Sequence, residues 1–360
     1  MRRSLSSLSN LRKMFLLGES DARRALDLAE CLNVNKAALI SLSKKTGVVP
    51  KRLGLPYPQN PNNRQSRQVT KGEAKDWTLI KPAAYYGDDD QSISMGMKVV
   101  SVRANNPARG LPLVPATILV IDPPTGIVEA TISGTYVTAA RTSAGPALAV
   151  QTFRPDLEHL VIFGAGVQAE HHIQLMELAV KRNIPRISII NRSLPRASEL
   201  RQKLLNQDGD RLVDVILLDD SNSVSDVLGS ADVVSATTNT STPLWSDGHV
   251  LKKGCLITGI GSYTPEMQEV PQYIVNLSHV VIDTPEAMDV GDLKHLGTYE
   301  SSSHPISMAG DALQDPSTIG ATKDYIFYKA VGTAIQDVLT AEAVINSAKK
   351  LGIGIEVDMS

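Results

Sequence analysis

The sequence predicts an α/β protein that combines a Rossmann-type doubly wound parallel sheet with a second domain of the α+β class. The chain has 360 residues, and at about 150 residues per domain this length favours two domains. Short strand patterns separated by turn residues occupy the first half, whereas strands alternate with helices from about Leu160 onward. Such an alternation is typical of a parallel sheet with helices on both faces.

The first half has the pattern of an α+β domain with an antiparallel sheet. Ser20 can cap a helix whose apolar residues keep helical spacing, at Ala22, Ala25, Leu26, Ala29 and Leu32. The polar stretch 57–76 has no periodicity and predicts a loop. Four short apolar runs predict strands, at 78–80, 98–102, 116–121 and 127–132. Turn residues at 121–126 predict a hairpin between the last two strands.

The second half repeats a strand–helix unit. The strands are expected at 160–163, 186–190, 213–218, 232–236 and 255–258, with helices at 168–180, 195–205 and around 223–228. This order predicts the doubly wound parallel sheet. A last amphipathic helix is expected at 329–350, because its apolar residues return to one face.

The composition excludes several classes of protein. The net charge is −2 and aromatic residues make up 4%, which disfavours both a broad nucleic-acid surface and a base-stacking platform. No run of 18 apolar residues occurs, so no membrane span is expected. Cys31 and Cys255 stand far apart, and neither the cysteines nor the histidines have metal-ligand spacing. We therefore expect reduced thiols and no metal.

The first residues bear on localisation. Residues 1–13 hold four basic residues, four serines and no acid. This composition is typical of a disordered leader, which we favour, with the folded part beginning at Met14. A short transit peptide is the alternative. The expected compartment is the cytoplasm, and the alternative is the mitochondrion.

A GxGxxA motif lies between the strand 160–163 and the helix 168–180. Its residues are Gly164, Ala165, Gly166, Val167, Gln168 and Ala169. The first glycine allows a tight turn, and the second lets a pyrophosphate approach the backbone. The free N–H groups of the helix N-terminus favour phosphate binding. Because strand, motif and helix follow in this order, the motif predicts a dinucleotide site.

The residues after the second predicted strand indicate which dinucleotide binds. In this position an acidic residue would bind the ribose 2′-hydroxyl of NAD, but the chain has Asn191, Arg192 and Ser193. An arginine attracts a 2′-phosphate, so NADP(H) is favoured over NAD(H). Thr237 and Thr238 follow the fourth strand, where ligands bind in open α/β sheets.

Three cationic residues of the first domain are candidates for substrate binding. Arg52 follows Val49-Pro50-Lys51, Lys98 lies on an apolar strand, and Arg141 lies in an alanine-rich segment. Arginine can bind a carboxylate in bidentate fashion. A desolvated lysine can act as acid or base, because burial lowers its pKa.

Together these segments resemble the ornithine cyclodeaminase/mu-crystallin family over nearly the whole chain. The matching pieces are FLLGESDARRAL, PKR, MGMKVVSV, GTYVTAARTSAG, IFGAGVQAEHH, NRS, ADVVSATTNTSTPLW and FYKAVGTAIQD. No single piece would suffice, but the set in this order is specific.

The resemblance implies a function for several residues. Residues matching Arg52, Lys98 and Arg141 hold and activate an amino or imino acid in this family, and Thr142 and the GxGxxA motif bind NAD(P). It also implies a homodimer, with a final helix that folds back on the first domain. We therefore expect a substrate-binding and dimerisation domain at 14–147 plus 328–360, and an inserted Rossmann domain at 148–327.

One departure from the family concerns ring closure. Ornithine cyclodeaminases proper have an Asp that falls on Tyr263 when Pro265 and Glu269 are kept in register. A carboxylate there would deprotonate the distal amine of ornithine, whereas tyrosine is uncharged at neutral pH. Ring closure with loss of ammonia is therefore disfavoured, unless a nearby Glu substitutes. Ketimine reductases of the mu-crystallin type also lack this Asp.

These observations lead to one hypothesis with two alternatives. We expect an NAD(P)H-dependent oxidoreductase of a small amino acid or cyclic imino acid, with hydride transfer at the α-carbon. Arg52 and Arg141 would hold the carboxylate, Lys98 would move the proton, and Tyr263 is a further catalytic candidate. The alternatives are an ornithine cyclodeaminase and a non-catalytic NADPH-dependent binder of small molecules.

Overall fold

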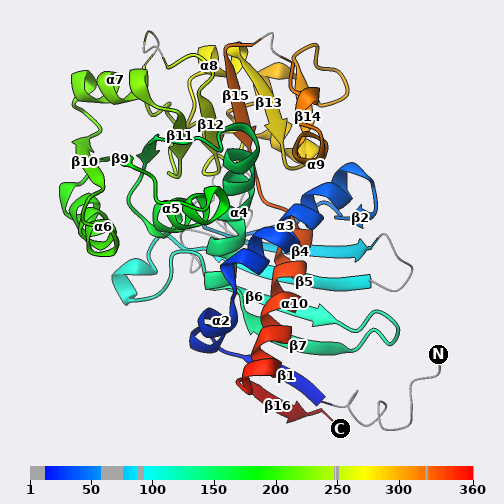
Figure 1. Cartoon of the computed structure of the whole chain (residues 1–360). Coiled ribbons are helices and arrows are strands. Elements are labelled where there is room, and N and C mark those ends of the chain that lie inside the picture. The colour runs from blue at the N-terminus through cyan, green and yellow to red at the C-terminus, as the bar shows by residue number, and fades with distance from the viewer. Residues whose placement is uncertain are drawn as a thin grey trace, which may run out of the picture. The chain divides into compact units, whose positions relative to one another are not determined.

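The computed structural model describes residues 13–57, 76–87, 93–246, 248, 251–320 and 323–359. The chain divides into two compact units, coloured along the chain in Figure 1. The first unit holds the residues up to Arg141 and those from Thr333 onward, and the second holds 142–332. Helix α4 (Thr135–Phe153) begins in the first unit and ends in the second. The roles that the sequence assigns to the two parts stay predictions.

The first unit is built on a mostly antiparallel sheet. Its strands are β1 (Lys13–Leu17), β2 (Gly47–Val48), β3 (Leu53–Tyr57), β4 (Asp76–Tyr86), β5 (Ile93–Val102), β6 (Ala116–Ile121), β7 (Val128–Ser133) and β16 (Ile355–Asp358). Their order is β16-β1-β7-β6-β5-β4-β2, and β3 pairs with another part of β4. The antiparallel β6–β7 pair confirms the predicted hairpin, and Gly126 in its turn has a φ of 71°, which favours glycine.

Three helices cover one face of this sheet. The long α10 (Ala334–Leu351), red in Figure 1, packs on β4, β5 and β6 and also against α2 (Glu19–Ala25) and α3 (Leu28–Ser43). Apolar side chains of the sheet and of α10 form a buried core that includes Ile118, Val120, Ile132, Val344 and Ile345. The sheet therefore presents one face to the helices.

The first residues of the folded part differ from the prediction. Two helices stand where one was expected, and Ser20 lies inside α2, which begins after Gly18. Asp27 interrupts the apolar pattern and caps α3, because its side chain accepts hydrogen bonds from the backbone N–H groups of Ala29 and Glu30. Lys13 already belongs to β1, one residue before the expected start, and residues 1–12 of the predicted leader lie outside the described residues.

The second unit contains the predicted Rossmann sheet. Its strands are β8 (His159–Phe163), β9 (Arg186–Asn191), β10 (Leu212–Leu217), β11 (Val233–Ala236), β12 (Leu256–Gly259), β13 (Ser278–Ile282), β14 (Ile306–Met308) and β15 (Tyr325–Lys329). They pair in parallel in the order β10-β9-β8-β11-β12-β15-β13-β14. From β8 to β10 the strands are added toward one edge of the sheet, and from β11 onward they are added toward the other edge. Ligands of open α/β sheets bind at the carboxyl ends of the two strands where this order reverses, here β8 and β11.

Helices connect the strands of the second unit. They are α5 (Val167–Val180), α6 (Leu194–Gln207), α7 (Ser221–Ser230), α8 (Gln272–Leu277) and α9 (Ala309–Gln314). Short 3₁₀ segments occupy Pro107–Arg109 in the first unit and Pro285–Asp289, Lys294–Leu296 and Pro316–Thr318 in the second. None of the helices that the structure describes combines the length and the apolar character needed to cross a membrane.

The last predicted helix begins later than expected. Residues 325–329 form β15, which lies between β12 and β13 in the sheet. Val331 and Gly332 follow as a connection, in which Gly332 has a φ of 73°, and α10 begins only at Ala334. Thr333 and Gln336 form a capping box that fixes this start.

Candidate functional site

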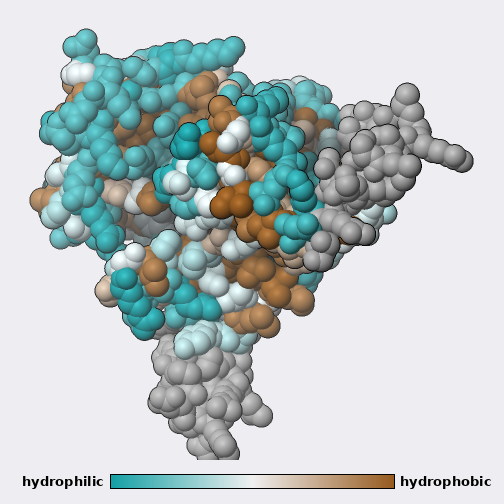
Figure 2. All heavy atoms as spheres, turned by 90° about the horizontal axis from the view of Figure 1, so that it is seen from below, coloured by the Kyte–Doolittle hydropathy of each residue, from teal (hydrophilic) through white to brown (hydrophobic). Residues whose placement is uncertain are grey.

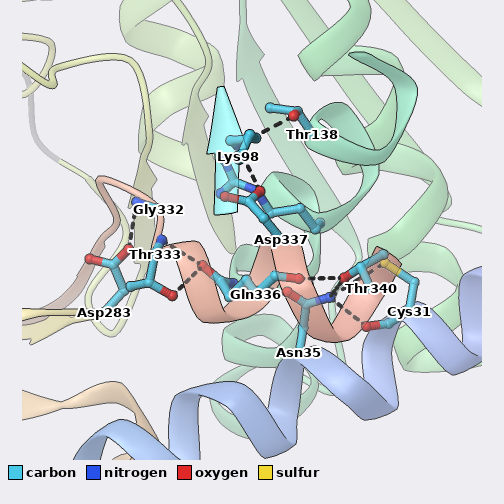
Figure 3. A network of polar contacts seen from close by, with 11 residues as sticks. Cys31, Asn35, Lys98, Thr138, Asp283, Gly332, Thr333, Gln336, Asp337 and Thr340 are labelled. Carbon is cyan, nitrogen blue, oxygen red and sulfur yellow. Dashed lines mark hydrogen bonds and ion pairs between the residues drawn. The ribbon is translucent and has the colours of Figure 1, made fainter. Parts of the chain in front are cut away.

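A buried carboxylate gathers two of the predicted substrate-binding residues in the first unit. Asp337 on α10 accepts hydrogen bonds at Oδ1 from Lys98 Nζ and from Arg141 Nε, each at 2.6 Å. Lys98 also donates to Thr138 Oγ1 at 3.3 Å. Figure 3 shows Lys98 between Asp337 and Thr138. The side chains of Lys98 and Asp337 are 1% and 0% exposed, so this ion pair lies in the interior.

Burial and neighbouring charges set the protonation of these groups. Burial lowers the pKa of Lys98 to about 7, and the charge of Arg141 acts in the same direction, whereas Asp337 opposes both. Burial disfavours the charged form of Asp337, but the neighbouring cations outweigh it and lower its pKa. A lysine with a pKa of about 7 can both donate and accept a proton near neutral pH.

Arg52 and Lys81 belong to the same electrostatic cluster. Arg52 is half-buried before β3, and its positive charge contributes to the lowered pKa of both Lys98 and Lys81. Lys81 on β4 lies directly opposite Lys98 on β5 and is only 4% exposed. The structure thus brings Arg52, Lys98 and Arg141 into one cluster, together with Lys81.

The sequence prediction missed Lys81 and Asp337. The sequence did contain a signal for Asp337. Residues four apart share a face of a helix, so Asp337 lies on the same face as Ala341, which belongs to the apolar face of the last helix. For Lys81 the signal was weaker. A lysine within an apolar strand pattern indicates a buried cation, but its pairing with Lys98 depends on a strand register that the sequence does not specify.

The GxGxxA motif forms the turn between β8 and α5 in the second unit. Gly164 has a φ of 106°, and a Cβ atom at this residue would lie 2.8 Å from Thr237 Oγ1. A Cβ at Gly166 would meet no atom within 4 Å, and α5 begins there without a side-chain cap. No side chain caps the first N–H groups of α5 and open space lies beside Gly166, which fits a bound pyrophosphate. Ala165, Val167 and Gln168 are also partly or fully exposed.

The end of β9 presents the residues that were predicted to choose between NAD and NADP. Asn191 is the last residue of the strand, and its side chain donates to the carbonyl of Ser193 at 2.8 Å. Arg192 and Ser193 are exposed. The N–H of Gly164 donates to the carbonyl of Ile190, so the end of β9, with the exposed Arg192 two residues further on, lies next to the nucleotide turn.

A buried glutamate holds the loops that follow β11 and β12. Glu269 accepts from the backbone N–H and the hydroxyl of Thr238 at one carboxylate oxygen, and from the N–H groups of Gly261 and Ser262 at the other. Burial raises the pKa of Glu269 to about 7, although Lys329 opposes the shift. Thr237 donates its hydroxyl to the carbonyl of Phe163. Both threonine hydroxyls are therefore used to fix the carboxyl edge of the sheet.

Thr142 follows Arg141 on α4 and is half-buried. The next residue, Ser143, donates to Gln168 Oε1 at 3.4 Å and contacts His172 Nδ1 at 2.9 Å. Thr142 therefore lies on the part of α4 that packs beside the start of α5. Within the described ranges no group of three or more His, Cys, Asp or Glu side chains could hold a metal ion, and both cysteines are free and buried.

Comparison with known proteins identifies the family. The model of the ornithine cyclodeaminase/mu-crystallin family matches residues 67–351. The chain belongs to this family. This confirms the resemblance stated from the sequence motifs.

Individual relatives of the ornithine cyclodeaminase/mu-crystallin family match the chain along almost its full length. A Dictyostelium discoideum protein named uncharacterized cyclodeaminase is 28% identical, over 96% of this chain and 100% of its own. A Bacillus cereus Δ1-pyrroline-2-carboxylate reductase is 26% identical with the same coverage. Among solved structures, the Δ1-pyrroline-2-carboxylate reductase of Thermococcus litoralis, in complex with NADH and L-proline, has a TM-score of 0.80 at 24% identity, covering 96% of this chain and 100% of its own. That likeness confirms the fold.

Tyr263 stands where cyclodeaminases of the family were expected to have an Asp. It follows β12 at the carboxyl edge of the parallel sheet and is partly buried, which raises the pKa of its hydroxyl. Glu269 cannot take over the role of the Asp, because four donors occupy its two oxygens inside the protein. Glu266 is exposed. Neither of these two glutamates therefore replaces the Asp as a carboxylate for binding a distal ammonium.

Proposed function

We propose that this chain is an NAD(P)H-dependent reductase of a small imino acid, with hydride transfer at the α-carbon. The observation that supports this most is the buried cluster in which Lys98 and Arg141 share one carboxylate oxygen of Asp337 and in which Arg52 and Lys81 also act on Lys98 or on each other. Guanidinium groups gathered in one place can bind a carboxylate, which favours a substrate that carries one.

Each residue of the cluster has a proposed task. Arg141 and Arg52 bind the carboxylate, because guanidinium groups can do so in bidentate geometry. Lys98 donates a proton to the imine nitrogen, since its pKa of about 7 leaves a large protonated fraction at neutral pH. When bound, the nicotinamide supplies the hydride that the imine carbon accepts. One hydride and one proton convert the imine into an amine, and the carboxylate is unchanged.

The dinucleotide would bind at the turn between β8 and α5. Gly164, Gly166 and the open N-terminus of α5 fit a pyrophosphate, and Thr142, Thr237 and Thr238 lie on the segments beside that turn. We propose NADP(H) over NAD(H), because Arg192 is exposed next to the end of β9 and can pair with a 2′-phosphate. Tyr263, at the carboxyl edge of the same sheet, is the further catalytic candidate of the second unit.

We propose in addition that the protein is a homodimer formed through the first-unit sheet. The face of this sheet that is turned away from the helices carries exposed apolar side chains, and Leu53, Leu55 and Ile93 are 63%, 53% and 41% exposed. Figure 2 shows that hydrophobic side chains gather next to one another on the surface drawn there. Contiguous apolar patches favour association, and in soluble proteins two-fold dimers are the commonest result.

The test of the proposed function is a substrate panel followed by the absorbance of the reduced nicotinamide. Cyclic imines such as a pyrroline or piperideine carboxylate should consume one equivalent of NADPH, and the Lys98→Met variant should consume none. If NADPH binds but no imine is reduced, the result would support the alternative of a non-catalytic binder. A lack of NADPH binding would contradict both.

The cyclodeaminase alternative is supported by the name of the Dictyostelium relative and opposed by Tyr263. Ornithine with only a catalytic amount of cofactor separates the two activities. Formation of proline and ammonia under these conditions would show the cyclodeaminase reaction. We expect no ammonia, because Tyr263 replaces the Asp and neither Glu266 nor Glu269 is placed to deprotonate the distal amine.

A further inference from the structure

Glu269 connects the segments that follow two neighbouring strands of the second-unit sheet. Its side chain is fully buried. One carboxylate oxygen accepts from the N–H of Thr238 at 2.8 Å and from the hydroxyl of the same residue at 3.0 Å. The other oxygen accepts from the N–H groups of Gly261 and Ser262, at 2.6 and 3.1 Å. Because Thr238 follows β11 and Gly261 follows β12, one side chain fixes the spacing of the two segments.

The backbone of Glu269 is held by a second buried carboxylate, that of Asp292. Asp292 Oδ1 accepts from the N–H groups of Glu269 and Val270, at 2.7 and 3.1 Å. Its Oδ2 accepts from Lys329 Nζ at 2.8 Å, and the side chains of Asp292 and Lys329 are both 0% exposed. Lys329 is the last residue of β15, which pairs with β12. Glu269 is therefore anchored to the sheet through a buried ion pair.

The segment after β11 that Glu269 holds packs directly against the nucleotide turn. A Cβ at Gly164 would lie 2.8 Å from Thr237 Oγ1 and 3.3 Å from Thr238 Cγ2. On the other side, a Cβ at Gly261 would overlap the carbonyl oxygen of Thr238. The nucleotide turn, the residues after β11 and the loop after β12 are thus in close contact. Since protein interiors are tightly packed, a shift of the segment at Thr238 would change the shape of the nucleotide turn.

The four hydrogen bonds to Glu269 require its ionised form. A carboxylate only accepts hydrogen bonds, whereas a protonated carboxyl group also carries an O–H that donates. Protonation of Glu269 would therefore weaken the hydrogen bonds at one of its oxygens, where other donors already point. Burial raises the pKa of Glu269 to about 7, with Asp292 acting in the same direction and Lys329 opposing it. Near neutral pH the protein without a dinucleotide thus contains both protonation states.

We propose that Glu269 is a positioning residue for the dinucleotide: its carboxylate form holds the segments after β11 and β12 in the arrangement that binds NAD(P)H, and binding therefore releases a proton. This inference rests on the proposed dinucleotide site at the turn between β8 and α5. Because Glu269 is fully buried, it acts through Thr238 and through the loop of Gly261. A ligand that binds one of two states shifts the equilibrium toward that state, so the protonated fraction of Glu269 loses its proton when the dinucleotide binds.

Calorimetry measures the released proton without turnover. NADPH is titrated into the whole protein in two buffers with different heats of ionisation, and the difference in heat gives the number of protons exchanged. At pH 7 the wild type should release about half a proton more than Glu269→Gln, since a pKa of about 7 leaves about half of Glu269 protonated. About two pH units higher the difference should vanish, because Glu269 is then ionised before binding. The 2′-phosphate of NADPH titrates as well, but it contributes equally to both proteins.

Matched variants separate positioning from general effects. Glu269→Gln replaces one accepting oxygen by an amide that donates, so it should weaken NADPH binding about 10-fold. Glu266→Gln changes an exposed glutamate of the same loop and should alter neither the Kd nor the proton release. Thr238→Val removes one donor to Glu269, which raises the pKa of Glu269 and should move the proton release to higher pH. Thr238→Ser keeps the hydroxyl and should keep the wild-type pH profile.

The possible failures are distinguishable. If the wild type binds no NADPH, the proposed dinucleotide site is wrong and this inference is wrong with it. If NADPH binds and the proton release is the same in the wild type and in Glu269→Gln, this inference alone is wrong, even where the variant binds more weakly. If Glu269→Gln does not fold, the two Thr238 variants decide, and a pH profile that Thr238→Val leaves unmoved would contradict the role of Glu269.

Discussion

Asp337 on α10 accepts a hydrogen bond from Lys98 on β5 at 2.6 Å, although 239 residues separate them in the sequence. The same carboxylate oxygen also accepts from Arg141. The second oxygen, Oδ2, is buried and has no hydrogen-bond partner among the described residues. The last helix therefore supplies the anion that holds the two cations of the proposed substrate site in place.

Replacing Asp337 by Asn should shift the pH dependence of reduction. Asp337 raises the pKa of Lys98, whereas burial and the charge of Arg141 lower it. Without the carboxylate, that pKa falls below about 7. If protonated Lys98 is required, kcat/KM falls as the pH rises through the pKa of Lys98. The decline should therefore begin at lower pH in Asp337→Asn, and a pH profile that does not move would contradict the proton-donor role.

The same substitution should destabilise the protein strongly. Removing one member of a buried ion pair leaves its partners charged in the interior, which typically costs about 3–5 kcal/mol. Asp21→Asn is the matched control, because Asp21 pairs with Arg24 at the surface and such pairs are worth about 0.2–1 kcal/mol. Urea unfolding of the two variants measures the difference, and equal losses would mean that Asp337 is not the buried anchor described above.

Replacing Lys98 by Met should abolish imine reduction and leave dinucleotide binding intact. Loss of a general acid lowers kcat by about 10²–10⁴-fold, whereas the β8–α5 turn belongs to the other unit. Stopped-flow turnover measures the first effect and a thermal shift with NADPH the second. A variant that reduces imines at the wild-type rate would remove Lys98 from the mechanism.

The two glycines of the nucleotide turn should respond differently to substitution. Gly166→Val adds a side chain in open space, so the protein should fold normally but bind NADPH at least about 10-fold more weakly, since the pyrophosphate needs that space. Gly164→Ala forces an alanine into a φ of 106° beside Thr237 and should lower the melting temperature itself. Calorimetry with and without NADPH separates the two effects.

Arg192→Ala tests the choice of cofactor. Loss of a charge-assisted contact to a 2′-phosphate should raise the KM for NADPH about 10–100-fold and change the KM for NADH little. Arg109→Ala, which removes an exposed arginine of the first unit, should change neither value. Equal KM values for NADPH in Arg192→Ala and the wild type would show that Arg192 does not bind the 2′-phosphate.

The sequence was sufficient to predict β8 to β12 of the Rossmann sheet, because these strands are short apolar runs separated by helical patterns, but β13 and β14 were not predicted. It was insufficient at β15, where Tyr325–Lys329 continues directly toward the last helix. The apolar spacing of that strand is compatible with a helix, and only its place between β12 and β13 in the sheet distinguishes the two. The residue pattern of one short segment does not specify its neighbours in the sheet.

The same limit applies to the site. Arg52, Lys98 and Arg141 lie in motifs with recognisable chemistry, whereas Lys81 and Asp337 acquire meaning only through their neighbours. The ladder register places Lys81 opposite Lys98, and the packing of α10 on β4 and β5 brings Asp337 to them. Both relationships connect residues that are distant in sequence, so no local pattern specifies them.

Glu342 should make the stability of the protein depend on pH. Burial raises the pKa of Glu342 from 4.5 to about 7, although Ser94 donates to it at 2.6 Å. The folded state therefore holds a proton that the unfolded state releases between pH 4.5 and about 7, so this residue lowers the free energy of unfolding as the pH rises through that window. Below it, both states are protonated and the effect is absent.

Glu342→Gln removes the titration and keeps an oxygen that can accept from Ser94. The free energy of unfolding, measured with urea at several pH values between 5 and 7, should then decline less steeply than in the wild type. Glu30→Gln, an exposed change on α3, is the control and should leave the slope unaltered. A slope that Glu342→Gln does not reduce would mean that the carboxyl group of Glu342 ionises in the folded protein as readily as in the unfolded chain.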